Sequence, residues 1–553
     1  MNAMSETVSN RDWPMLPSFL TFLQQAAIAR QNGQHDAHAI WLQAASHLYG
    51  TRADAINALT FELLEHQQFA DAIALANAMT WLDPDSAEAH FRFGYALQVA
   101  GHHDQAIAPY SRALAMQPDL PQLRNNLAIA LRFSGGDPAE ELRLLEAAVN
   151  ANPSECEAWI NLASAYRTRM DLDRALSAGA RAVELGPDNP KALNNYVLVL
   201  KEAQRWDEAE HYAQAAVTLA PNEASHRFNL AVLQLVMGNF ALGWAGYEAR
   251  WDGAVELRGN RRPVFSAPQW RGESLAGKTL LVWGEHGIGD LLHGCRFIPL
   301  LAERVRQEGG RLIWSSLPQM GQLLVRSLGD YVDGYSAGGS IDELPPFDYE
   351  VSLLSLPLLL ETGKLTLAST VPYLRADAVA SARWRARLAQ ERRLKVGLAW
   401  TGSRTHQRNP FRRVGWERYA AAFSGQEGVA FYSLQPDAQA DVEAARRAGL
   451  PLVDHTAEWA NFDDTAAYIS ALDLVITVCT SVAHLSGALG QRTWVLLDVN
   501  PHWTWLLERR DSPWYPSVTL YRQSKFARWG RVFAEVSADL AIMTRRHRHA
   551  GLP

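Results

Sequence analysis

The residues in this sequence that are best suited to chemistry lie where a buried strand gives way to a helix. Leu474 to Val478 is a short apolar run typical of a parallel strand buried on both faces. Thr480 and Ser481 are good N-caps for a helix that starts at about Val482. The free amides and partial positive charge of such a helix start favour an anion such as a phosphate. The alternative is an ordinary strand and helix unit, since the segment contains no GxGxxG sequence.

Further side chains are candidates for the same anion site. Arginine holds an oxyanion with two parallel donors, and four arginines follow a strand predicted to end at Trp400: Arg404, Arg408, Arg412 and Arg413. His484 lies one turn inside the predicted helix, and Gln435, at the end of another strand, could contact a nucleoside. The plainer alternatives are that the arginines are solvated loop residues and that His484 is a satisfied core histidine.

The elements that must position these residues alternate between strand and helix, which predicts parallel sheets covered on both sides. Strands are expected at 278–283, 311–314, 349–353, 395–400, 429–434, 474–478 and 493–497. Helices are expected at 291–307, 380–392 and 437–448, with another from residue 464. Ligands of such sheets bind beyond the carboxyl ends of the strands. The loops expected to converge are therefore 284–290, 401–413, 435–437 and 479–484.

The N-terminal half contains an internal repeat. Five prolines recur 34 or 35 residues apart, at Pro84, Pro118, Pro153, Pro187 and Pro221. This period resembles that of tetratricopeptide (TPR) arrays, in which each repeat is a helix pair. A small or compact residue in the first helix keeps the same phase, as at Gly94, because two helices touch there. Gly135 to Pro138 adds one residue and Glu141 replaces the usual alanine, so that repeat's second helix is expected to start irregularly.

Asparagines recur two residues before the small residue of each first helix. They are Asn126, Asn161, Asn195 and Asn229. On the inner wall of the array they form a ladder of carboxamides, each able to donate to and accept from a peptide main chain. The ladder predicts a polypeptide partner. Its alternative role is to bond neighbouring turns within the array.

Length and charge narrow the class of protein. With 553 residues the chain exceeds what one hydrophobic core usually supports. A formal charge of −7 gives no electrostatic reason to expect nucleic acid or an anionic membrane as partner. The sequence lacks a signal peptide and a run of about 20 apolar residues that could span a bilayer, so we expect a cytoplasmic protein. Its three cysteines are far apart and predict neither a disulfide framework nor a metal site.

Seven motifs, in order, resemble bacterial TPR-containing glycosyltransferases. They are Glu285-x-Gly-x-Gly-Asp290, Val396-Gly-Leu-x-Trp400, Ser433-Leu-Gln435, Asp464-Thr-Ala-Ala467, Asp473-Leu-Val-Ile-Thr477, Thr480-Ser-Val-Ala-His-Leu485 and Asp511-Ser-Pro-Trp-Tyr-Pro516. The C-terminal halves of these enzymes are similar to the GT-B lobes of heptosyltransferases, and their architecture resembles O-GlcNAc transferase. The resemblance implies an all-α TPR solenoid followed by an α/β GT-B fold of two Rossmann-like lobes.

The expected domains follow from the repeat and from this resemblance. They are a divergent helical cap (1–53), TPR repeats (54–251), a connector (252–277), an acceptor-side lobe (278–380) and a nucleotide-sugar lobe (381–553). The resemblance implies a metal-independent reaction with no cofactor, in which the nucleotide sugar is a co-substrate. The expected donor-site residues are Arg404, Arg412, Gln435, Cys479, Thr480, Ser481, Val482 and His484.

The resemblance also suggests individual roles. Asp290 matches the aspartate that faces the cleft in heptosyltransferases, which makes it the expected base; its alternative role is to cap a helix starting at Leu291. His286 and His293 are competing bases. Arg412 matches a phosphate-binding lysine. Cys479 stands where relatives usually have a donor-facing aspartate, which implies a different sugar or an activity that is reduced or lost, with a cysteine nucleophile as a further alternative.

Three functions fit these observations. The first is an inverting glycosyltransferase that transfers a sugar to a Ser or Thr of a polypeptide held by the repeats. The second has the same donor site but a glycan or lipid acceptor, as in heptosyltransferases, although a small acceptor needs no long concave wall. The third is a non-catalytic TPR scaffold whose transferase lobes are degenerate.

Overall fold

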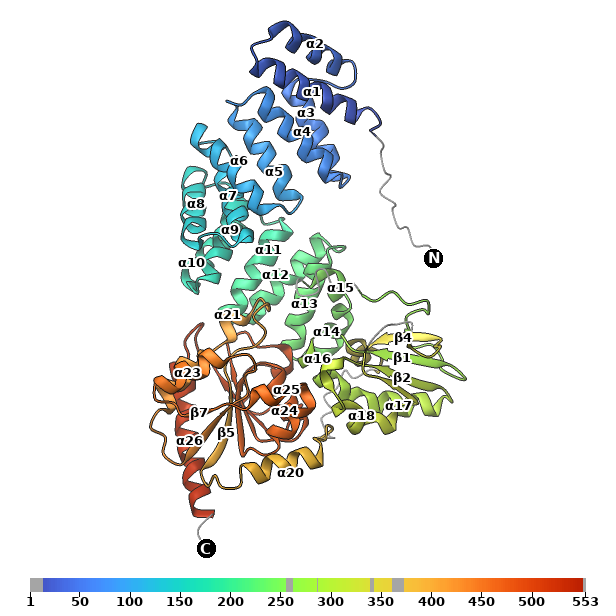
Figure 1. The fold of residues 1–553 in the computed structure, drawn as a ribbon, viewed down its shortest axis with the longest axis vertical. Coiled ribbons are helices and arrows are strands. Elements are labelled where there is room, and N and C mark those ends of the chain that lie inside the picture. Colours follow the sequence, from blue (N-terminus) through green and yellow to red (C-terminus); the bar gives the residue numbers. More distant parts are fainter. Residues whose placement is uncertain (1–12, 255–261, 286, 339–342, 361–371, 551–553) are drawn as a thin grey trace. The chain divides into compact units, whose positions relative to one another are not determined.

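The structure is a computed structural model that describes residues 13–254, 262–285, 287–338, 343–360 and 372–550. The chain divides into two compact units, residues 1–199 and 200–553. The described part of the first unit is entirely helical, whereas the second unit combines helices with two parallel sheets (Figure 1). The five domains expected from the sequence are finer than this division and stay predictions.

The first unit is a series of antiparallel helix pairs. Its helices are α1 (Leu16–Gln31), α2 (His35–Ser46), α3 (Ala53–Glu65), α4 (Phe69–Leu82), α5 (Ala87–Val99), α6 (His103–Met116), α7 (Leu123–Ser134), α8 (Pro138–Ala151), α9 (Cys156–Thr168) and α10 (Leu172–Leu185). The two helices of each pair pack on one another; from α4 to α9 the second helix of a repeat also packs on the first helix of the next, whereas the first pair packs on the array through α1 and α4. A helical solenoid results, which confirms the repeat. The unit boundary falls within α11 (Pro190–Glu202).

Proline and glycine have the positions that the repeat requires. Pro84 and Pro118 each lie two residues beyond the last residue of a second helix, α4 and α6. At Gly94 of α5, a Cβ atom would lie 2.7 Å from the ring of Tyr110 on α6, so a larger residue could not keep this helix contact. The small residue in phase is therefore needed for the close approach of two helices.

The start of α8 differs from those of the other second helices, because its N-cap Asp137 is extended with ψ 116°, whereas the N-caps Gln68, His102 and Asp171 have ψ of 60°, 59° and 80°. Asp137 caps this helix by accepting a hydrogen bond from the Ala139 amide, and proline at the first position suits a helix start. Glu141 is buried at 6% exposure and accepts a 2.5 Å hydrogen bond from Arg132 Nε. A partner from the preceding helix α7 thus stabilises the carboxylate where other repeats have alanine.

The second unit begins with helices and continues into a four-stranded sheet. The helices are α12 (Trp206–Leu219), α13 (Ala224–Val236), α14 (Phe240–Tyr247) and α15 (Arg250–Gly253). The sheet has the parallel order β3 (Gly334–Ser336), β2 (Arg311–Ser315), β1 (Thr279–Trp283) and β4 (Tyr349–Ser352). The helix expected over 291–307 is instead α16 (Ile288–Gly294), a 3-10 turn and α17 (Ile298–Gln307). Pro299 lies in the first turn of α17, where its missing N–H would interrupt a continuous helix.

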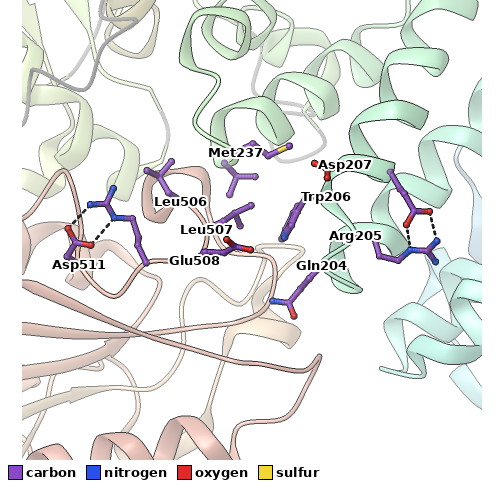
Figure 2. Close-up of a pocket in the computed structure, with 12 residues that line it drawn as sticks. Gln204, Arg205, Trp206, Asp207, Met237, Leu506, Leu507, Glu508 and Asp511 are labelled. Atoms are coloured by element: carbon purple, nitrogen blue, oxygen red, sulfur yellow. Dashed lines mark hydrogen bonds and ion pairs between the residues drawn. The ribbon is translucent and has the colours of Figure 1, made fainter.

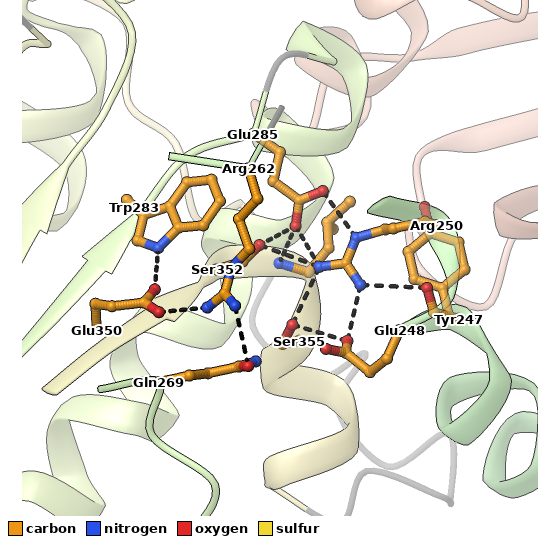
Figure 3. Close-up of polar contacts among 11 residues, drawn as sticks. Tyr247, Glu248, Arg250, Arg262, Gln269, Trp283, Glu285, Glu350, Ser352 and Ser355 are labelled. Atoms are coloured by element: carbon orange, nitrogen blue, oxygen red, sulfur yellow. Dashed lines mark hydrogen bonds and ion pairs between the residues drawn. The ribbon is translucent and has the colours of Figure 1, made fainter. Parts of the chain in front are cut away.

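A buried arginine connects the end of the helical region to this sheet (Figure 3). Arg250 is 1% exposed and donates from Nε and Nη2 to the two carboxylate oxygens of Glu285, at 3.0 and 2.7 Å. Its Nη1 donates to Glu248 at 2.8 Å, and its Nη2 also reaches Ser352 and Ser355. Glu285, the first residue of the glycine-turn motif, therefore has a structural role at the end of β1.

The second sheet has six parallel strands. Their order is β10 (Val518–Arg522), β9 (Thr493–Leu497), β8 (Leu474–Val478), β5 (Leu394–Ala399), β6 (Val429–Ser433) and β7 (Leu452–Val453). All five residues of β8 are buried, as the apolar run predicts. Strands β3, β7 and β10 were not predicted, because they are short or carry alternating polar residues. Across the described residues, no helix has both the length and the apolar character to cross a bilayer.

Helices flank both sheets (Figure 1). Those not yet named are α18 (Leu323–Leu328), α19 (Leu356–Leu359), α20 (Ala378–Arg387), α21 (Asn409–Arg412), α22 (Gly415–Phe423), α23 (Gln439–Arg447), α24 (Phe462–Ile469), α25 (Ser481–Ala488) and α26 (Gly530–Ala550). Side chains of α22 and α26, among them Tyr419 and Val536, share one apolar core with the strands of the second sheet. The α/β prediction is confirmed at the level of two parallel sheets.

Candidate functional site

In each sheet, the strand that comes first in the sequence pairs with a later strand on each of its two sides. β1 is flanked by β2 and β4, and β5 is flanked by β6 and β8. Loops diverge at such a point, and ligands of open parallel sheets bind there, beyond the carboxyl ends of the strands. The loops in question are residues 284–290 after β1, 401–413 after β5 and 479–484 after β8. These are three of the four loops that the sequence predicts to converge.

Close packing of α16 on α25 brings the two sheet edges together. A Cβ atom on Gly289 would lie 3.1 Å from His484 Cδ2 and 3.8 Å from Ser481 Cα, so glycine permits the approach. Asp290 follows directly. The predicted base from the first sheet therefore lies near the predicted anion site of the second.

Asp290 lies in the first turn of α16 and has a partner from the other sheet. Because α16 starts at Ile288 with Gly287 as N-cap, Asp290 is not the cap of a helix that starts at Leu291. Its Oδ1 lies 3.6 Å from Nε2 of His502, and the two side chains are about one third exposed, 33% for Asp290 and 31% for His502. The carboxylate is thus accessible to a ligand.

His502 is a site residue that the sequence analysis missed. Thr504 donates its backbone N–H to His502 Nδ1 at 3.5 Å, and the Thr504 hydroxyl is 2.8 Å from the same nitrogen. With Nδ1 as acceptor, Nε2 carries the proton and faces Asp290. Burial, and then the neighbouring charges of His406 and Arg412, lower the pKa of His502 to about 3. The sequence could have indicated His502 only through its position in the loop that follows the carboxyl end of β9.

Cys479 is the residue after β8 and is buried at 8% exposure. Its Sγ accepts a hydrogen bond from Trp505 Nε1 at 3.1 Å. Burial raises the pKa of the thiol, with Asp498 and Asp290 adding to the effect. A protonated, hydrogen-bonded thiol is a poor nucleophile. The geometry therefore opposes a nucleophilic role.

Arg412 lies at the end of α21, against the backbone at Gly402. A Cβ atom on Gly402 would be 2.5 Å from its Nη2. Among the described residues, Arg412 Nε is buried without a hydrogen-bond partner. The charge of Arg412 contributes to the lowered pKa values of His484 and His502 and opposes the raised pKa of Cys479. Arg412 and Asp290 thus both lie near enough to Cys479 to influence the pKa of its thiol, in opposite directions.

The other arginines of this loop differ from one another. Arg408 is not solvated: it donates to Glu202 and Asp498, each at 2.5 Å, and so connects the loop after β5 to α11 and to the end of β9. Arg404 and Arg413 are exposed. The structure therefore brings Arg412 into the site, uses Arg408 as a structural connection and leaves Arg404 at the surface.

The helix start at α25 is partly used by the protein itself. Thr480 Oγ1 accepts the Val482 N–H at 3.1 Å, as expected for an N-cap, so that amide already has a partner. Ser481 and Thr480 are half-buried. Gln435 accepts a 3.2 Å hydrogen bond from the Thr401 amide, which fixes its side-chain oxygen next to the loop after β5.

His484 and His293 belong to a buried aromatic cluster between α16 and α25. His484 Nδ1 is 3.0 Å from Tyr515 Oη, and its ring stacks on Trp505 with centroids 5.0 Å apart. His293 is 1% exposed and its Nδ1 is 3.1 Å from the same hydroxyl. Burial lowers the pKa of both histidines, so both are neutral packing residues. The other competing base, His286, lies outside the described residues.

The asparagines make contacts within the protein. In the first unit, Asn161 donates to Asn125 Oδ1 of the preceding repeat at 2.9 Å, and Asn195 donates to the Lys191 carbonyl at 3.0 Å. Asn126 is buried at 7% exposure. Asn229 lies on α13 of the second unit. Asn161 and Asn195 thus form hydrogen bonds within the array. Peptide binding by the asparagine ladder stays a prediction.

The arrangement suits proton removal next to an anion. Asp290 supplies a carboxylate, and Arg412 and the start of α25 supply positive charge. Within the part of the chain that is described, no three His, Cys, Asp or Glu side chains are grouped so that they could hold a metal ion.

Comparison with known proteins identifies the repeat region. Residues 62–121, 91–154 and 126–190 match the tetratricopeptide repeat family, so this part of the chain is a TPR solenoid. Protein FlbA of Caulobacter vibrioides is 27% identical over 77% of this chain and 73% of its own length. Human protein O-mannosyl-transferase TMTC1 is 28% identical over 27% of this chain, which spans only 17% of that protein.

Two solved structures with a likeness to this chain are described as TPR proteins. TTC0263, a thermophilic TPR protein of Thermus thermophilus, is 24% identical over 32% of this chain and 96% of its own, with a TM-score of 0.29. YrrB, a TPR protein with an unusual peptide-binding site, is 22% identical over 31% of this chain and 88% of its own, with a TM-score of 0.26.

Proposed function

We propose that this chain is a GT-B glycosyltransferase that moves a sugar from a nucleotide sugar to a Ser or Thr hydroxyl of a polypeptide held by the TPR array. One observation carries the proposal: Asp290, which follows β1 of the first sheet, lies 3.6 Å from His502, which follows β9 of the second sheet, and its neighbour Gly289 packs on the start of α25. Two facing sheets with ligand sites at these edges are what a donor and an acceptor require.

In the proposed reaction Asp290 removes the proton from the acceptor hydroxyl as its oxygen attacks the anomeric carbon. A new carbon–oxygen bond forms, the bond from that carbon to the diphosphate breaks, and attack from the opposite side inverts the configuration. Arg412 and the start of α25 stabilise the departing negative charge. His502, neutral because of its lowered pKa, lies with Nε2 3.6 Å from Asp290 and adds no positive charge beside the carboxylate. No metal is required by these steps.

A TPR scaffold without catalysis is the second candidate. It is favoured by the bonds that the site already makes internally, from Thr480 to Val482, from His484 to Tyr515 and from Trp505 to Cys479. The name of TMTC1 agrees with sugar transfer to protein, but the matched stretch is 17% of that protein, so the site geometry carries the proposal instead. A glycan or lipid acceptor is less suited to a long repeat array.

A screen of nucleotide sugars tests the proposal. The full chain is heated with UDP, GDP, ADP, CMP and dTDP sugars, and its melting temperature is recorded. A ligand at a hundredfold excess over its Kd stabilises the folded state by about 2.7 kcal/mol, which gives a measurable shift. Stabilisation by one base class, followed by transfer of that sugar to a Ser/Thr-containing peptide, supports transferase activity. The scaffold alternative is favoured if no donor shifts the transition.

A further inference from the structure

A pocket of about 850 Å³ lies in the second unit, and none of the residues proposed above for the donor site or as base lines it (Figure 2). It opens between the start of α12, the end of α13 and the loop after Trp505. Trp206, Met237 and Leu507 supply partly buried apolar surface to it. The volume is within the usual range of ligand sites, about 300 to 1,000 Å³.

Acidic side chains outnumber basic ones around the pocket. Four acidic and two basic side chains line it. Arg205 pairs with Glu208, and Arg509 pairs with Asp511 at 2.6 Å, so both basic groups are neutralised locally. The acids left over are Asp207 of α12 and Glu508 of the loop, both exposed. The pocket therefore presents apolar surface beside net negative charge.

The loop is held in shape before any ligand arrives. Leu506 and Glu508 have φ angles of 52° and 53°, a left-handed conformation that costs a non-glycine residue about 1 to 3 kcal/mol. Arg522 keeps them there by donating to the carbonyls of Trp505, Leu506 and Arg509, at 2.6, 2.9 and 2.7 Å. Strained backbone that is fixed in this way is found at ligand clamps. Figure 2 shows Leu507 and Glu508 on one side of the space and Trp206 on the other.

We propose that this pocket binds a polypeptide segment in which an apolar side chain lies next to a lysine or arginine. The apolar side chain contacts Trp206, Met237 and Leu507, and the cation lies between Asp207 and Glu508. A polypeptide supplies both groups along one extended chain, and repeat arrays present extended surfaces to such partners. The pocket goes beyond the transfer reaction, because docking there involves no donor. It would select partners by sequence, which a carboxamide ladder that reads only main chain cannot do.

The test measures binding of a short fluorescein-labelled peptide, in which leucine alternates with arginine, to the full chain by fluorescence anisotropy without any nucleotide sugar. The double variant Asp207→Asn, Glu508→Gln should bind about tenfold more weakly, since two exposed charge interactions are lost. The control Glu427→Gln, Glu443→Gln removes two exposed acids elsewhere and should bind like the unmodified protein.

Charge reversal separates specific docking from misfolding. Asp207→Lys with Glu508→Lys should bind a peptide in which glutamate replaces arginine, and should lose the arginine peptide. A misfolded variant cannot gain a new preference. The proposal is overturned if the unmodified chain does not bind the arginine peptide, or if the pocket variants bind both peptides as the unmodified chain does. Because no donor is present, a negative result leaves the transferase proposal intact.

Discussion

Asp290 and His502 come from different sheets and meet at 3.6 Å, from Oδ1 to Nε2. The aspartate follows β1 and the histidine follows β9, so their contact depends on the packing of α16 on α25. Because the imidazole is neutral, it adds no full positive charge that would lower the basicity of the carboxylate. The pair therefore suits a base held ready to accept a proton.

Replacing Asp290 by asparagine should abolish sugar transfer while donor binding survives. The substitution keeps the shape of the side chain but removes the proton acceptor, and general bases contribute about 10²- to 10⁴-fold to rate. The kcat of transfer and the donor Kd from calorimetry are measured in parallel. Undiminished transfer by Asp290→Asn would remove Asp290 from the mechanism, and a lost donor affinity would show a binding role instead.

Replacing Arg412 by alanine should weaken donor binding by about ten- to a hundredfold, which corresponds to the loss of a hydrogen bond to a charged group. The physical reason is the buried Nε, which has no partner among the described residues and would be satisfied by a diphosphate oxygen. Calorimetric titration with the stabilising nucleotide sugar gives Kd. Arg413→Ala, at an exposed position of the same loop, is the matched control. Equal affinities for the two variants would contradict the assignment.

Acid should destabilise the second unit through two half-buried histidines, His406 and His502. Burial lowers the pKa of His502 to about 3 and that of His406 to about 4, both from the ordinary 6.5. The unfolded chain then binds more protons than the folded one below pH 6.5, so stability falls as the pH decreases from 6.5 towards 3. For each histidine the loss is at most about 1.4 kcal/mol per pH unit.

Urea unfolding between pH 4 and 7 measures this effect. The variant His406→Gln, His502→Gln should have a flatter dependence on pH than the unmodified protein, whereas the control His211→Gln, at an exposed position, should not. An unchanged slope in the double variant would mean that other groups cause the acid sensitivity.

The sequence was informative where local patterns determine structure. The β8 run and the caps of α25 were recognisable because a buried strand is apolar and Thr480 is a good cap. Contacts between distant segments were not recognisable: Arg408 meets Glu202 across 206 residues. His502 lies in a loop whose sequence has no period, so its approach to Asp290 follows only from tertiary packing. The sequence predicts one continuous amphipathic helix over 291–307, whereas the structure divides this segment before Pro299.

Replacing Glu285 by glutamine should destabilise the second unit by about 3 kcal/mol, measured as the free energy of unfolding in urea by tryptophan fluorescence. The substitution leaves the buried Arg250 with Glu248 as its remaining carboxylate partner and removes the charge and one of the two acceptor oxygens at position 285 (Figure 3). Breaking one side of a buried ion pair costs more than the pair contributes, because the remaining charge stays desolvated. Arg250→Met combined with Glu285→Leu, which removes both charges, should therefore recover part of the loss. A single variant as stable as the unmodified protein would show that Glu285 is not a structural residue of this sheet.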